Sequence, residues 1–108
     1  MRLLLDENLP KRLKTDFPEY EIFTVSDKQW NSFTNGRLLE LMLQDNFDAL
    51  FTFDKNLQYQ QNFAKYPITV LILNASLNSY EALAPLVPQI KTFLKQEPLP
   101  KGATVISK

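Results

Sequence analysis

Short apolar runs, each the length of one β-strand, recur along this chain and are separated by segments with helical spacing. Because most of these runs are apolar throughout, the strands that they predict are buried on both faces, as in parallel sheets. The predicted strands are Arg2–Leu5, Glu21–Val25, Ala49–Phe53, Ile68–Leu73 and an edge strand at Ala103–Ser107. Strands that alternate with helices predict an α/β domain with a mostly parallel sheet and helices on both faces. A chain of 108 residues suits one domain, so we expect residues 1–108 to form a single unit.

The segments between these strands carry helix start and stop signals. Helices are expected from Asn8 to about Asp16, from Asn35-Gly36 to about Asp45, at Asn56–Phe63 and, after interruptions at Pro85 and Pro88, at Gln89–Gln96. Asn8 is a good N-cap for the first of them. Asn78 and Glu81 form a capping-box pattern at the start of the last helical region.

Acidic residues follow two of the predicted strands. Asp6 comes directly after the first strand and Asp54 directly after the third. In open α/β sheets, ligands bind outside the carboxyl ends of the strands, so both acids are expected at the edge where such folds keep their sites. Acids are also common in loops and helix caps, where they accept hydrogen bonds from free N–H groups. Both interpretations stay open on position alone.

Composition limits the chemistry that this chain can perform. It has no cysteine and no histidine, which removes disulfides, thiolate metal sites and the usual general base. Carboxylate oxygens are, however, good ligands for Mg²⁺ or Mn²⁺, which can activate water for phosphodiester cleavage. The net charge of zero neither supplies nor forbids a basic patch for nucleic acid. The apolar run Met1–Leu5 is too short for a secretory signal, so we expect a cytoplasmic protein with no membrane partner.

Two motifs resemble those of a known protein family. Leu3-Leu4-Leu5-Asp6-Glu7-Asn8-Leu9-Pro10 resembles the opening signature of a PIN-like family of largely unknown function, and Thr52-Phe53-Asp54-Lys55-Asn56-Leu57 resembles its second signature. Two further segments resemble one branch of that family: Asn35-Gly36-Arg37-Leu38-Leu39 and Tyr59-Gln60-Gln61-Asn62. The likeness runs from Met1 to about Leu94.

The resemblance implies a three-layer α/β/α PIN fold. It implies, for active members, a metal-dependent ribonuclease acting on single-stranded RNA with Mg²⁺ or Mn²⁺. Such proteins often occur as candidate toxins of toxin–antitoxin pairs, so an antitoxin protein is an expected partner. The secure catalytic and metal-binding acids are then Asp6 and Asp54, with Glu7 beside them. Glu7 can equally stabilise the first helix through the helix dipole.

This chain departs from the family pattern at two positions. Many relatives carry acids where this chain has Asn35 and Asn56, and an amide oxygen can ligate a metal but brings no charge. Glu40 is the obvious substitute, but a helical wheel places it roughly opposite the apolar stripe, so we expect it to face solvent and to be dispensable. That stripe consists of Leu38, Leu39, Met42 and Leu43.

Other polar and aromatic residues have weaker claims on the site. The amides Asn8, Asn35, Asn56 and Gln61 are possible accessory ligands or substrate contacts. Lys11, Arg12 and Lys14 are more simply explained as surface residues than as a phosphate-binding patch. Trp30 and Phe33 can stack on a base, although core or interface roles are the simpler interpretation.

Three functions compete at this stage. The first is a metal-dependent ribonuclease, and the second is a PIN fold with impaired metal binding that serves as an RNA- or protein-binding module. The third and most remote is a receiver-like signalling domain, since receivers also place acids after their first and third strands. Ser76 and Lys101 mimic the accessory residues of receivers.

Overall fold

A single parallel sheet of five strands forms the centre of the protein. The computed structural model describes residues 1–108. The strands are β1 (Arg2–Leu5), β2 (Glu21–Thr24), β3 (Ala49–Thr52), β4 (Thr69–Asn74) and β5 (Gly102–Ser107). They lie in the order β2-β1-β3-β4-β5, and every neighbouring pair is parallel. The α/β fold with a parallel sheet and the edge position of β5 are therefore confirmed.

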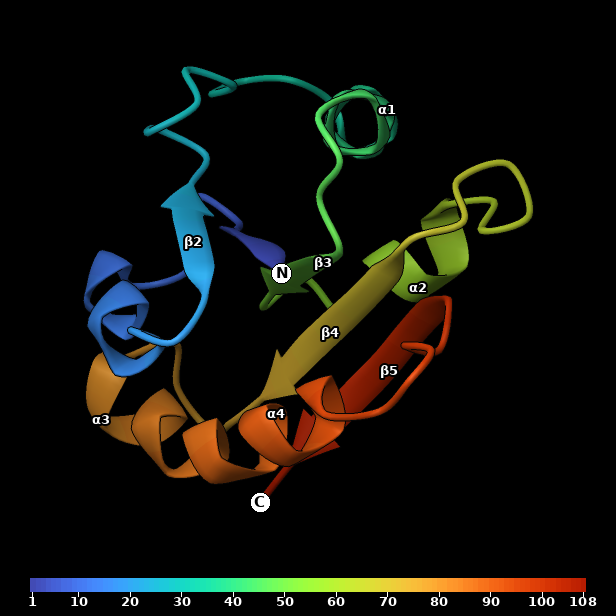
Figure 1. The fold of residues 1–108 in the computed structure, drawn as a ribbon. Coiled ribbons are helices and arrows are strands. Elements are labelled where there is room, and N and C mark those ends of the chain that lie inside the picture. Colours follow the sequence, from blue (N-terminus) through green and yellow to red (C-terminus); the bar gives the residue numbers. More distant parts are fainter.

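Helices cover both faces of this sheet and give the molecule three layers (Figure 1). The helical elements are η1 (Lys11–Asp16), α1 (Asn35–Gln44), α2 (Leu57–Gln60), α3 (Tyr80–Leu83), η2 (Ala84–Leu86) and α4 (Val87–Leu94). One buried cluster joins the sheet to η1, α3, η2 and α4, and a second joins it to α1 and α2. We call the second side the α1 face.

The alternation of side chains along β1 shows why this sequence is buried on both sides. Leu3 and Leu5 belong to the cluster beneath α3 and α4, whereas Leu4 belongs to the cluster on the α1 face. Successive side chains of a strand point to opposite faces, so three consecutive leucines fill both cores at once. The next position, Asp6, falls on the same side of the sheet as Leu4.

The first helix differs from the prediction. It is a 3₁₀ helix that begins at Lys11, and Asn8 is not its N-cap. Pro10 has an extended backbone with ψ of 128°, so the chain is not helical before Lys11. The Asn8 carbonyl instead accepts a hydrogen bond from the side chain of Asn78, in the loop after β4.

Two later helices also begin or end differently from the prediction. The expected helix Asn56–Phe63 is reduced to α2, because Gln61 already has an extended backbone. Ser79, not Asn78, caps α3, and its hydroxyl accepts a hydrogen bond from the N–H of Ala82. Pro85 and Pro88 interrupt the last helical region as expected, each within the first turn of a new segment.

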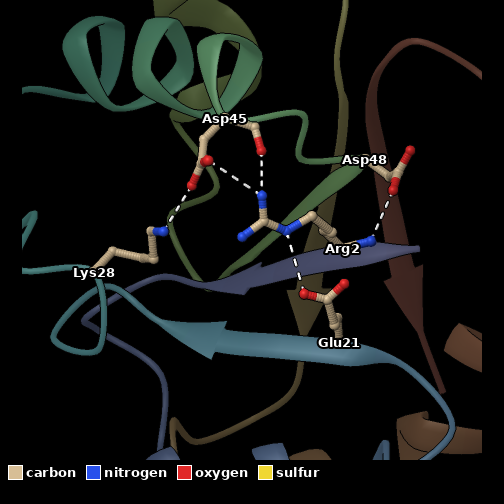
Figure 2. A network of polar contacts seen from close by, with 5 residues as sticks. All are labelled: Arg2, Glu21, Lys28, Asp45 and Asp48. Carbon is tan, nitrogen blue, oxygen red and sulfur yellow. Dashed lines mark hydrogen bonds and ion pairs between the residues drawn. The ribbon is translucent and has the colours of Figure 1, made fainter.

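The amino end of β1 is held by a network of ion pairs (Figure 2). The guanidinium of Arg2 lies 3.2 Å from a carboxylate oxygen of Asp45 and 3.5 Å from one of Glu21. The Arg2 N–H donates to Asp48, and Lys28 pairs with Asp45 at 2.7 Å. This network joins β1 and β2 to the segment between α1 and β3. None of the helices is long and apolar enough to cross a membrane.

Candidate active site at the carboxyl ends of β1 and β3

The strand order places the topological switch point of the sheet between β1 and β3. The connection from β1 to β2 passes through η1 on one face, whereas the connection from β2 to β3 passes through α1 on the other. The chain leaves β1 toward β2 and leaves β3 toward β4, that is, toward opposite edges of the sheet. In doubly wound sheets of this order, ligands bind at that switch point, outside the carboxyl ends of the strands. Asp6 follows β1 and Asp54 follows β3, so both acids lie beside the switch point.

Asp6 is nearly enclosed, with 9% of its surface exposed, and both of its carboxylate oxygens accept hydrogen bonds. The hydroxyl of Thr52 donates to Oδ2 at 2.7 Å, and the backbone N–H of Glu7 donates to Oδ1 at 2.9 Å. Its backbone N–H donates to the carbonyl of Phe51 at 2.9 Å. These contacts fix the carboxylate in position at the end of β1.

Thr52 links the two acids. While its hydroxyl donates to Asp6, its oxygen accepts a hydrogen bond from the backbone N–H of Asp54 at 3.1 Å. Thr52 ends β3 and is fully buried. Thr52 was not among the site residues predicted from the sequence. The sequence did carry a signal for this role. Thr52 ends an apolar strand next to the strand that Asp6 follows, and a buried hydroxyl needs a polar partner.

Asp54 is half-buried and begins the turn that leads into α2. Its Oδ1 accepts a hydrogen bond from the backbone N–H of Asn56 at 3.0 Å. Asn56 therefore stabilises Asp54 through its backbone N–H, and Asn56 itself is exposed. The other oxygen of Asp54 has no hydrogen bond within the protein.

Electrostatics at the site act against a charged Asp6. Burial raises the pKa of Asp6 above 3.8, and the negative charges of Glu7 and Asp54 raise it further. The hydrogen bonds from Thr52 and from the Glu7 N–H oppose this rise. The two carboxylates thus lie close enough for their charges to interact, and a cation between them would relieve the repulsion.

The neighbouring residues Glu7 and Asn8 lie at the rim of the site. Glu7 is exposed, and its carboxylate accepts a hydrogen bond from the side chain of Asn31 at 3.3 Å. The side-chain oxygen of Asn8 accepts a long hydrogen bond of 3.4 Å from the N–H of Phe53. Asn8 therefore ties the loop after β1 to the end of β3.

The structure brings the segments of Asn35 and Gln61 together on the α1 face. A Cβ added at Gly36 would lie 3.5 Å from Oε1 of Gln61 and 3.7 Å from the hydroxyl of Tyr66. Asn35 and Gln61 are both half-buried. Thr34 caps α1, since its hydroxyl accepts a hydrogen bond from the N–H of Arg37. This cap was missed in the sequence, although threonine before a helix is a standard signal.

Glu40 does not join the acids. Its side chain is 46% exposed and pairs with Arg37 one helical turn earlier. Buried residues of α1 are Leu38, Leu39 and Met42, which agrees with the predicted stripe. The exposure of the Glu40 side chain agrees with the helical-wheel prediction, while the dispensability of Glu40 stays a prediction.

The oxygen ligands at this site suit a single hard cation, such as Mg²⁺ or Mn²⁺, with few protein ligands. No group of three or more acidic side chains in the chain is arranged to hold a metal ion. Asp6 and Asp54 are the two carboxylates that could share a cation, with amide oxygens and water completing its coordination. Because few anionic ligands are present, such a cation would be held weakly.

Comparisons with known proteins leave the family open. No family model, curated protein or solved structure matches this chain. The PIN-like assignment accordingly stays a prediction from the two sequence motifs.

A cavity of about 240 Å³ lies away from the two acids, at the carboxyl ends of β4 and β5. Its lining includes Ser76, Glu81 and Lys108 but neither Asp6 nor Asp54. Lys101, the predicted receiver-like lysine, lies at the opposite edge. It precedes Gly102, which pairs with Thr69 at the amino end of β4. Lys101 therefore lies at the amino ends of the strands, whereas Asp54 lies at their carboxyl ends.

Proposed function

We propose that this protein is a metal-dependent endoribonuclease of the PIN-like type, acting on single-stranded RNA. The observation that supports this most is the linkage of Asp6 and Asp54 through Thr52 at the switch point of the sheet. The two acids follow separate strands, and the buried Thr52 hydroxyl bonds to the carboxylate of Asp6 and to the backbone N–H of Asp54. Two carboxylates at neighbouring strand ends are suited to sharing a divalent cation. The choice of RNA as the substrate and of the PIN-like family rests on the resemblance of the two sequence motifs.

The residues of the chain have distinct roles in this proposal. Asp6 and Asp54 would hold the cation, and the hydrogen bond from Thr52 fixes the carboxylate of Asp6. When bound, Mg²⁺ or Mn²⁺ would supply an activated water and neutralise the charge that develops on the phosphate. Asn35 and Gln61 belong to segments that meet at Gly36, and in this proposal their amides contact water or a phosphate oxygen. With no histidine in the chain, proton transfer must use carboxylates or solvent.

A second candidate function is an RNA- or protein-binding module without turnover. The small number of acids favours it, because no third acidic side chain joins Asp6 and Asp54 in a metal-binding group. The receiver-like hypothesis gains from the strand order, which flavodoxin-like folds and receivers share. It loses more from the position of Lys101 and from the separation of the Ser76 cavity from Asp54.

A role as the toxin of a toxin–antitoxin pair belongs to the same proposal and rests on the resemblance alone. Its partner would be an antitoxin protein that blocks access to Asp6 and Asp54. Co-expression with the product of a small adjacent gene would test this, because an antitoxin should co-purify with the protein and inhibit its nuclease activity.

Cleavage of RNA tests the enzyme proposal directly. We expect the wild-type protein to cleave single-stranded RNA when Mn²⁺ is added and to stop when EDTA is added. Asp6→Asn and Asp54→Asn should each abolish turnover, because each removes one of two anionic ligands. Glu40→Gln is the matched control, since it removes an exposed acid outside the site and should leave the rate unchanged.

The outcomes separate the candidates. Activity that survives EDTA, or that survives in Asp6→Asn, would contradict the proposed mechanism. Binding of RNA without cleavage under any metal condition would favour the binding module. Transfer of a phosphoryl group from acetyl phosphate to Asp54, detected by intact mass, would instead favour the receiver hypothesis.

A further inference from the structure

Two exposed aromatic rings lie in the two segments that meet at Gly36 and Gln61. Tyr59 is 81% exposed, which is the largest value among the exposed large hydrophobic residues, and Phe33 is 46% exposed. Phe33 lies three residues before Gly36, and Tyr59 lies two residues before Gln61. Since a Cβ at Gly36 would lie 3.5 Å from Oε1 of Gln61, the segments that carry the two rings meet at this point.

Hydrogen bonds tie the Tyr59 backbone to Asp54. The N–H of Tyr59 donates to the carbonyl of Asn56 at 3.0 Å, and the N–H of Asn56 donates to the carboxylate of Asp54 at 3.0 Å. Tyr59 is thus fixed within two hydrogen bonds of a proposed metal ligand. Phe33 directly precedes Thr34, which caps α1.

Neither ring contributes to the core. Leu57 is the buried residue of α2, and at about 100° per residue Tyr59 points away from it. In the loop after β2, Trp30 packs on Phe47 with ring centroids 5.7 Å apart, whereas Phe33 remains half exposed. Trp30 and Phe33 therefore differ, since Trp30 packs against the core and Phe33 does not.

We propose that Phe33 and Tyr59 stack on unpaired bases of an RNA strand whose backbone passes Asp6 and Asp54. This inference rests on the proposed function and deepens it, because it requires that the substrate be unpaired beside the cleaved bond. Stacking on aromatic rings tolerates any base, so the site selects for single strands rather than for sequence. Lys55 follows Asp54 directly, is exposed and forms no ion pair, so it is available to a phosphate.

The surroundings of the rings favour RNA over a protein partner. Polar residues lie close to both rings in the sequence, and most of them are exposed. The exposed ones are Asn31, Ser32, Thr34, Gln60 and Asn62, and Gln58 is half-buried. Two separate rings in polar surroundings do not form the contiguous apolar patch that marks most protein interfaces. They do match the alternation of stacking surfaces and polar groups that binds single strands.

The test measures RNA binding separately from cleavage. Fluorescence anisotropy with a labelled ten-nucleotide RNA is run at low salt in EDTA, so that no turnover occurs. We expect Tyr59→Ala and Phe33→Ala each to weaken binding about tenfold, which matches the loss of one base stack. Tyr59→Phe should bind within about twofold of wild type, because it keeps the ring. Leu77→Ala is the matched control, since Leu77 is 66% exposed in the loop after β4.

Each result decides the inference. Wild-type affinity in Tyr59→Ala, equal loss in Leu77→Ala, equal affinity for duplex RNA, or no binding of single-stranded RNA by the wild-type protein would overturn it. Thermal unfolding of every variant confirms that the fold is intact. Binding that depends on Tyr59 without any cleavage supports the stacking inference and contradicts the nuclease. Cleavage with a KM that Tyr59→Ala leaves unchanged would support the nuclease and contradict the stacking inference.

Discussion

At the scale of single residues, the hydroxyl of Thr52 connects the two acids of the proposed site. It donates to a buried carboxylate and at the same time accepts from the backbone N–H that begins the Asp54 turn. A buried carboxylate that loses a hydrogen-bond donor remains desolvated and becomes harder to ionise. Thr52 is therefore expected to influence the charge of Asp6 and the position of Asp54 together.

Thr52→Val tests this role through protein stability. We expect a loss of about 1–3 kcal/mol in the free energy of unfolding at pH 7, because Asp6 loses its side-chain donor. Burial already holds the pKa of folded Asp6 above 3.8, and removing the donor raises it further. The charged form is therefore destabilising above the folded pKa, and this penalty is relieved as the pH falls toward 3.8. Urea unfolding between pH 7 and pH 4 should show the difference from wild type shrinking.

Thr69→Val is the matched control for this experiment. Thr69 is also a fully buried threonine of the sheet, but its hydroxyl donates to the neutral carbonyl of Pro100 at 2.8 Å. Its loss should amount to about 1 kcal/mol at every pH. A Thr52→Val difference that stays equally constant with pH would show that Asp6 does not depend on Thr52.

The sequence was enough to locate the two acids relative to the strands, but not to predict their contacts. Asp6 and Asp54 could be placed at one edge of the sheet, because each directly follows an apolar strand. The Thr52 bridge and the approach of Gln61 to Gly36 could not be predicted, since they depend on side-chain direction and on where α2 ends. Both are properties of packing between segments that lie far apart in the sequence.

At the scale of elements, the amino ends of β1 and β2 are joined to the end of α1 by Arg2 (Figure 2). Besides its ion pairs, the guanidinium lies 4.7 Å from the ring centroid of Phe47 and 5.2 Å from that of Phe23. Lys28, and Arg2 to a lesser degree, hold the pKa of Asp45 below 3.8. A planar guanidinium can stack and pair in several directions at once, which an ammonium group cannot do.

Arg2→Lys should therefore destabilise the protein by about 1–2 kcal/mol, although it keeps the charge. Lys91→Ala is the comparison, because the pair between Lys91 and Glu19 lies at the surface and should contribute less than about 0.5 kcal/mol. Thermal and chemical unfolding measure both changes. A loss in Arg2→Lys no larger than that in Lys91→Ala would contradict a structural role for this network.

Element boundaries show which sequence signals were reliable. The strands were predicted to within one residue at either end, because apolar runs are bounded by charged residues, prolines or turns. Helix starts were less reliable, because the side chains of two good caps are used elsewhere. The Asn8 side chain accepts a hydrogen bond from the N–H of Phe53, and the Asn78 side chain donates to the carbonyl of Asn8. A tertiary contact therefore replaced the local cap, which no local pattern could indicate.

At the scale of the whole molecule, the order of the strands decides where a ligand can bind. The alternation of strands and helices predicted a parallel sheet, but not the order β2-β1-β3-β4-β5. That order depends on which face each connection crosses, and the amphipathic pattern of a helix does not name the face that it will cover. The order places the switch point between the two strands that carry Asp6 and Asp54.

The most direct test of a shared carboxylate site is the position of a bound metal ion. Crystals soaked in Mn²⁺ and measured at its absorption edge would locate it by anomalous scattering. We predict one peak of partial occupancy between the carboxylates of Asp6 and Asp54, with Mg²⁺ competing weakly, and no peak there in crystals of Asp54→Asn. A peak elsewhere on the protein, or no peak at Mn²⁺ concentrations at which RNA is cleaved, would contradict the account.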